Sequence, residues 1–85
     1  MDSEIKQALK DFIITNYLFG DARRVPENEE SLIESGIVDS TGILELIEFL
    51  EKTYRINVLD TETLPENLGS ISNLTLFISR KMAEA

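Results

Sequence analysis

The segment that decides the fold is residues 34–50, ESGIVDSTGILELIEFL, where a helical pattern begins abruptly at Asp39 and Ser40. A helix needs only one short polar side chain as its N-cap, yet two stand here side by side. If Asp39 is the cap, Ser40 becomes the first helical residue and its hydroxyl is left for another task. If Ser40 is itself the cap, the pair has no further meaning.

The pattern after the pair predicts a helix from about Ser40 to Tyr54. At about 100° per residue, one face collects the apolar side chains and we expect it to be buried. This face contains Ile43, Leu46, Ile47, Leu50 and Tyr54, with Phe49 at its margin. The other side carries Thr41, Leu44, Glu45, Glu48, Glu51 and Lys52.

The outward side of this predicted helix allows two interpretations. Glutamates at helical spacing most often mark only a solvated surface. However, Leu44 among them is typical of a docking surface, whose carboxylates would steer a basic partner. We therefore expect partner contacts at Thr41, Leu44, Glu45, Glu48 and Glu51.

The rest of the chain also has helical periodicity. The first helix should be capped by Asp2 or Ser3 and continue through Tyr17, Leu18 and Phe19 to a stop at Gly20. Its apolar face would consist of Ile5, Leu9, Phe12 and Ile13. Residues 20–39 form a long connection that we expect to be packed through Leu32, Ile33, Ile37 and Val38.

The C-terminal part predicts a turn and two further helices. Residues 55–62 would turn the chain, with Ile56 and Val58 pointing inwards. Pro65 suits the first position of a short helix that ends near Gly69, and Ser70 would cap the last helix. That helix would bury Ile71, Leu74, Phe77 and Ile78. The sequence therefore predicts one all-α domain over residues 1–85, a four-helix bundle with a short third helix.

Charge and composition restrict the possible functions. Sixteen acidic and eight basic residues give a formal net charge of −8, which disfavours nucleic acid and favours basic partners. The chain has no Cys and no His, so thiolate catalysis, Ser-His triads and His- or Cys-based metal sites are excluded. We also expect no calcium loop in DTETLPENLGS, because Pro65 occupies the position where an EF-hand needs glycine. No apolar run reaches the about 20 residues that a membrane span needs, and no leader is evident, so we expect a cytoplasmic protein. We also expect it to be a monomer without catalytic residues.

The motifs together resemble the acyl carrier proteins. SLIESGIVDST, the helix containing Glu45, YRINV and PENLGSISNL follow that family in order, from about Ile5 to Ile78. The resemblance implies that Ser40, preceded by Asp39, receives a 4′-phosphopantetheine arm from coenzyme A. It also implies a phosphopantetheinyl transferase of the holo-carrier synthase type as a partner. Acyl-loading and acyl-processing enzymes with basic docking surfaces would be the other partners.

Two positions depart from the family pattern. Thr41 stands where Leu or Met is usual, and Glu48 where a small apolar residue is usual. Both changes make the partner-facing surface more polar, which favours a dedicated carrier over one for housekeeping fatty-acid synthesis. Acyl, polyketide and aminoacyl cargo all remain open. The alternative is an unmodified acidic interaction module with the same fold, although such a module would not need both Asp39 and Ser40.

Overall fold

The computed structural model describes residues 2–84, which form four α-helices and no strand. The helices are α1 (Asp2–Tyr17), α2 (Ser40–Tyr54), α3 (Pro65–Leu68) and α4 (Ile71–Glu84). Two short 3-10 helices, η1 (Ala22–Arg24) and η2 (Asp60–Glu62), lie in the connections. The predicted all-α bundle with a short third helix is confirmed. None of the helices in the described part of the chain combines the length and apolar character needed to cross a membrane.

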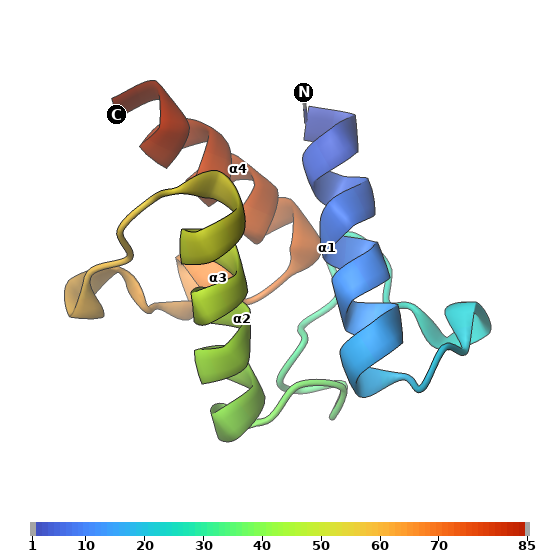
Figure 1. The fold of residues 1–85 in the computed structure, drawn as a ribbon. Helices are drawn as coiled ribbons and strands as arrows, with labels where there is room; N and C mark the ends of the chain where they lie inside the picture. The colour runs from blue at the N-terminus through green and yellow to red at the C-terminus, as the bar shows by residue number, and fades with distance from the viewer. Residues whose placement is uncertain (1, 85) are drawn as a thin grey trace.

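Helix α4 is the element against which α1, α2 and α3 all pack (Figure 1). Its predicted stripe is confirmed, because Ile71, Leu74, Phe77 and Ile78 are almost completely buried. Ser70 precedes the helix, and its hydroxyl oxygen accepts the N–H of Asn73 at 3.1 Å, as an N-cap does. Half of the remaining core side chains come from α1 and α2, and the others come from the connections and α3. They are Ile5, Leu9, Ile13, Leu18, Leu32, Val38, Leu46, Leu50, Ile56 and Leu68.

Both predicted ends of the first helix need correction. Asp2 and Ser3 already lie within α1, so neither is the residue that precedes it. At the other end α1 stops at Tyr17, because Phe19 and Gly20 adopt left-handed backbone conformations with φ of 53° and 85°. The Gly20 N–H then bonds to the carbonyl of Ile14 at 2.9 Å, which satisfies a group at the helix terminus.

The connection between α1 and α2 is packed, as expected, but not through all of its predicted anchors. Leu32 and Val38 are buried and Ile37 is half-buried, whereas Ile33 is 48% exposed. A backbone hydrogen bond of 2.9 Å from Leu32 to Gly69 ties this connection to the end of α3. Ile33 therefore belongs to the surface.

The buried face of α2 is rotated from the prediction. Gly42, Leu46 and Leu50 are its buried residues, while Ile43 and Ile47 are only half-buried. The reason is the close approach of α1 at Gly42: a Cβ atom there would lie 3.1 Å from a ring carbon of Tyr17.

Aromatic side chains fill the space between α1 and α2. Phe12 of α1 stacks on Phe49 of α2, with ring centroids 4.2 Å apart. Phe49 in turn contacts Tyr54 edge-on at 6.4 Å. Phe12 and Tyr54 pack against the core and Phe77 lies within it, so the interpretation of these aromatic residues as core is confirmed.

Candidate functional site

The start of α2 separates the roles of the two adjacent polar residues. Asp39 is the N-cap: its Oδ1 accepts the Gly42 N–H at 2.7 Å, and its backbone is extended. Ser40 is the first helical residue and is exposed. Within residues 2–84 its hydroxyl makes no hydrogen bond, since the capping position is already occupied by the aspartate. The Ser40 hydroxyl is therefore free, at the end of the helix where the macrodipole favours a negative charge.

Tyr17 holds this end of α2 against α1. Its phenolic hydroxyl donates a 2.8 Å hydrogen bond to the carbonyl oxygen of Gly42. Burial, together with the negative charges of Glu45 and Asp39, raises the pKa of Tyr17 to about 12. The phenol is thus protonated, and remains a donor, throughout the neutral and moderately alkaline range.

The expected docking residues divide into two groups. Thr41, Leu44, Glu45 and Glu48 are exposed, with Leu44 at 63%. Glu51 is half-buried instead, and its Oε2 accepts the backbone N–H of Val58 at 3.0 Å. The structure therefore presents one leucine, one threonine and two glutamates to solvent, while the fifth side chain is engaged within the molecule.

A groove of about 610 Å³ with a mixed polar and apolar lining begins beside Ser40 and follows α2. Its polar lining consists of Ser40, Glu51, Asp60 and Thr63. Its apolar lining consists of Ile33, Ile43, Leu44, Ile47 and Val58. A smaller hollow continues beneath α3 and shares Ile33, Ile43 and Thr63 with the groove.

The groove is a feature that the sequence reasoning missed. Ile43 and Ile47 pack against the core, as predicted, but they also line this groove, together with the exposed Ile33. The available signal was Gly42, because a glycine inside a helix costs about 1 kcal/mol relative to alanine and is usually kept for a packing or functional reason. Because Gly42 is buried against Tyr17, helix α2 is oriented so that Ile43 and Ile47 lie beside the groove.

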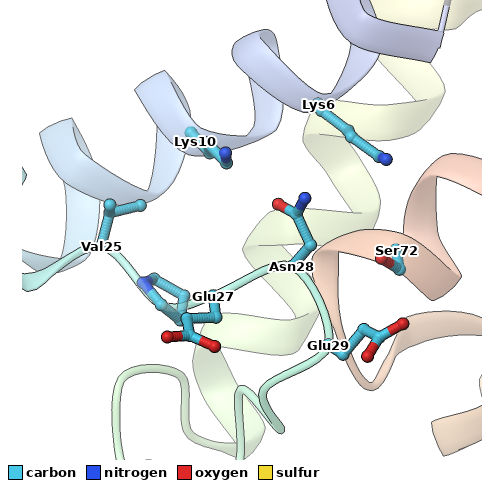
Figure 2. A pocket seen from close by; sticks show the side chains of 8 residues that line it. Lys6, Lys10, Val25, Glu27, Asn28, Glu29 and Ser72 are labelled. Carbon is cyan, nitrogen blue, oxygen red and sulfur yellow. The ribbon is translucent and has the colours of Figure 1, made fainter.

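A second concavity lies between α1, the following connection and the start of α4 (Figure 2). Lys6 and Lys10 of α1 face a loop that contains Glu27, Asn28 and Glu29. The two lysines and two glutamates balance in formal charge, so the hollow has no clear preference for an ion. Its lining lacks an evident nucleophile–base pair, and Ser40 with its groove is the better candidate site.

The acidic side chains of the described residues do not form a metal site. Across residues 2–84, no cluster of three or more Asp or Glu side chains is close enough to do so. The candidate site combines the free hydroxyl of Ser40, the capped start of α2 and the adjacent groove.

Comparison with known proteins gives one informative relative. No family model matches the chain. Over 79 residues it is 25% identical to the probable acyl carrier protein PigG of Serratia sp. (strain ATCC 39006). The alignment covers 93% of this chain and 90% of PigG. This distant similarity over nearly the whole length, together with the all-helical fold, supports a carrier function in general.

Proposed function

We propose that this chain is a non-catalytic acyl carrier protein whose Ser40 bears a 4′-phosphopantetheine arm. The observation that carries the proposal is the division of roles at the start of α2. Asp39 accepts the helix N–H at 2.7 Å, and the exposed Ser40 hydroxyl is left without a partner in the described chain. Similarity to a probable acyl carrier protein points in the same direction.

The residues present fit the arm. A phosphodiester on Ser40 would lie at the N-terminus of the 15-residue helix α2, where an anion is stabilised by about 0.3–1 kcal/mol. The adjacent groove offers five apolar side chains to an attached group. Because the chain contains no cysteine, the arm supplies the thiol on which acyl or aminoacyl cargo is held as a thioester.

Attachment requires a partner enzyme, a phosphopantetheinyl transferase. In this reaction the Ser40 hydroxyl oxygen forms a bond to the β-phosphorus of coenzyme A, and the bond to the α-phosphate oxygen breaks. The hydroxyl proton passes to a base of the transferase, and 3′,5′-ADP leaves. Mg²⁺ held by the transferase offsets the charge of the two phosphates. No general base from the carrier itself is needed.

The exposed side of α2 is the proposed docking surface for the transferase and for acyl-loading and acyl-processing enzymes. We define this docking surface as Thr41, Leu44, Glu45 and Glu48. Leu44 would provide apolar contact, and the glutamates would accelerate encounter with a basic enzyme surface. Glu51 is left out because its carboxylate is bonded to Val58.

Intact-mass measurement tests the proposal. The purified chain is incubated with coenzyme A, Mg²⁺ and a broad-specificity phosphopantetheinyl transferase. We expect one phosphopantetheine group on the original protein and none on Ser40→Ala. Ser72→Ala is a matched control, since Ser72 also lies in the first turn of a helix, α4, and it should be modified normally. An unmodified original protein would favour the acidic interaction module, and modification of Ser40→Ala would refute the assigned serine.

A further inference from the structure

One side of the groove beside Ser40 is formed by residues 58–64, here called the wall segment. Val58, Asp60 and Thr63 line the groove itself, and Thr63 and Leu64 line the hollow beneath α3. A displacement of this segment would change the width of both spaces. Its attachment to the rest of the bundle therefore determines what the groove can accept.

Apolar packing holds the wall segment only weakly. Leu59 is 50% exposed, Leu64 is 43% exposed and Val58 is half-buried. The nearest side chain within the core is Ile56, two residues before the segment begins. A segment with so few buried apolar contacts belongs to the part of a protein that opens locally at low free energy, unless polar contacts restrain it.

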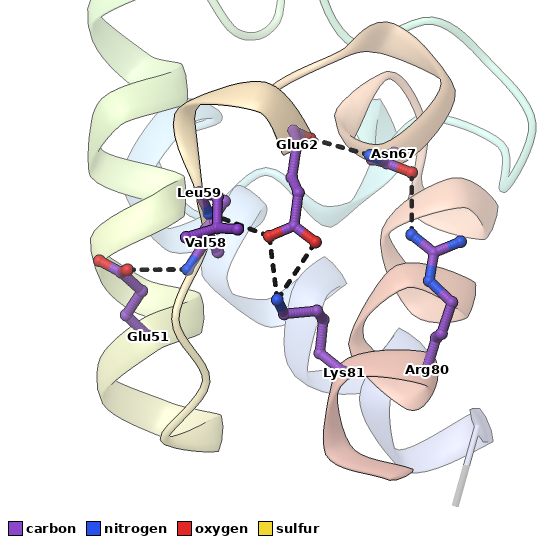
Figure 3. A network of polar contacts seen from close by, with 7 residues as sticks. All are labelled: Glu51, Val58, Leu59, Glu62, Asn67, Arg80 and Lys81. Atoms are coloured by element: carbon purple, nitrogen blue, oxygen red, sulfur yellow. Dashed lines mark hydrogen bonds and ion pairs between the residues drawn. The ribbon is translucent and has the colours of Figure 1, made fainter. Parts of the chain in front are cut away.

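The main polar contact joins Glu62 in η2 to Lys81 in α4 (Figure 3). The Lys81 ammonium donates to both carboxylate oxygens, at 2.9 and 3.1 Å. One of these oxygens also accepts the Leu59 N–H at 3.0 Å. The two side chains are only 21% and 14% exposed, so this pair is less screened by solvent than an ordinary surface pair.

Two further hydrogen bonds attach the wall segment to its neighbours, one at its first residue and one at Glu62. Glu51 of α2 accepts the Val58 N–H at 3.0 Å, and the Asn67 side-chain amide donates to the Glu62 carbonyl at 2.9 Å.

The backbone hydrogen bond from Leu59 and the bond from Lys81 lower the pKa of the Glu62 carboxyl. Glu62 is therefore ionised at neutral pH, as the contact with Lys81 requires.

We propose that Glu62 and Lys81 are positioning residues that latch the wall segment and so set the width of the groove beside Ser40. The biological meaning of this latch rests on the proposed carrier function, in which the groove receives cargo. The segment lies between Arg55, the left-handed residue that caps the end of α2, and Pro65, the first residue of α3. When the contact between Glu62 and Lys81 is broken, the wall segment opens. The packing of α4 against α1, α2 and α3 persists.

Amide hydrogen exchange on the unmodified full chain tests the latch. Val58, Leu59, Glu62 and Thr63 are the reporters, because each of their N–H groups is hydrogen-bonded in the closed segment. In Lys81→Met we expect these four amides to exchange about tenfold faster, with the amides of Ile43 and Leu74 unchanged. Lys81→Arg should restore most of the protection. Glu62→Gln provides a second variant, since it removes the charge while keeping an oxygen for the Leu59 N–H.

Matched controls separate the latch from general effects of charge. Lys52→Met removes a positive charge from an exposed position on α2, and Glu66→Gln removes a negative charge from an exposed position on α3, outside the groove. Neither control should alter exchange of the reporters. The uncharged fluorescent probe N-phenyl-1-naphthylamine should bind several-fold more tightly to Lys81→Met than to either control.

The outcomes are distinct. Reporter exchange unchanged in both Lys81→Met and Glu62→Gln would overturn the proposal, as would equal acceleration throughout the chain. Unaltered probe binding despite faster exchange would also overturn it, because the groove width would not depend on the latch. None of these measurements uses the arm on Ser40. The latch and the carrier assignment can therefore fail independently.

Discussion

The Tyr17 hydroxyl donates to the carbonyl oxygen of Gly42 at 2.8 Å, and a ring carbon of the same tyrosine would lie 3.1 Å from a Cβ atom at Gly42. The tyrosine thus makes a hydrogen bond to the Gly42 carbonyl, and its ring lies so close to the Gly42 Cα that a side chain at this position would be crowded. The contact joins the end of α1 to the first turn of α2, two residues from Ser40. It fixes the rotation of α2 about its axis, and with it the residues that face the groove.

Gly42→Ala should destabilise the protein even though alanine is the better helix former by about 1 kcal/mol. The new methyl would also lie 3.0 Å from Val38 Cγ1, and overpacking of this kind costs about 1–3 kcal/mol. We expect a net loss of about 1 kcal/mol. Combined with Tyr17→Leu, the substitution should cost less, because the ring is gone. Urea unfolding of the four proteins measures this coupling, and an equal cost in both backgrounds would contradict the role given to the ring.

The two tyrosines should titrate differently from free tyrosine. Burial raises the pKa of both from 10.0, and that of Tyr17 to about 12. Since the folded-state pKa is the higher one, the contribution of Tyr17 to stability is complete below pH 10 and is lost as the pH rises to about 12. Phenolate absorbance of Tyr54→Phe isolates Tyr17. A midpoint near pH 10 in the folded protein would show that the phenol is accessible to solvent.

Asp39 should act on stability through its cap. Asp39→Ala removes the acceptor of the Gly42 N–H and should lower the free energy of unfolding by about 1 kcal/mol. Asp39→Asn retains a side-chain oxygen and should remain close to the original protein. Chemical denaturation of the three proteins gives the comparison. Equal losses in both variants would indicate that the charge of Asp39, and not its capping bond, supports α2.

Charge reversal on the docking surface should slow attachment of the arm. Glu45 is exposed on the outer side of α2, so Glu45→Lys should change stability by no more than about 0.5 kcal/mol. Because encounter with a basic enzyme is steered electrostatically, we expect about a tenfold lower association rate that recovers at high salt. Stopped-flow measurement of transfer gives the rate.

The control for this reversal is Glu4→Lys on α1. Glu4 is exposed in the first turn of α1, and its replacement changes the net charge by the same amount. It should slow transfer much less than Glu45→Lys. Equal slowing in the two variants would mean that the enzyme senses only the net charge and that α2 is not a specific docking surface.

Local interactions allowed the sequence to predict most helix positions. The Asp39 and Ser70 caps and Pro65 at the start of α3 act within one helical turn, so their signals lie within a few neighbouring letters. The proposed role of Ser40 rests on more than such a short pattern, because the Asp39-Ser40 pair carries meaning only with the resemblance of the whole chain to the carrier family. The end of α1 was less predictable, because Tyr17, Leu18 and Phe19 all fit the helical pattern. The left-handed backbone at Phe19 is unfavourable for a bulky residue and has no local signal.

Only the tertiary structure decided which side of α2 is buried and how the groove is closed. The apolar pattern of α2 is wide enough to permit more than one rotation, and Tyr17, 25 residues before Gly42, selects one. The sequence predicts Glu51 as an exposed docking residue, whereas in the folded chain its carboxylate accepts the N–H of Val58, seven residues later. Glu62 and Lys81 are 19 residues apart and carry no shared motif. Periodicity reports whether a residue is apolar or polar, but a contact between distant segments depends on how whole helices pack, and that is settled only when the bundle forms.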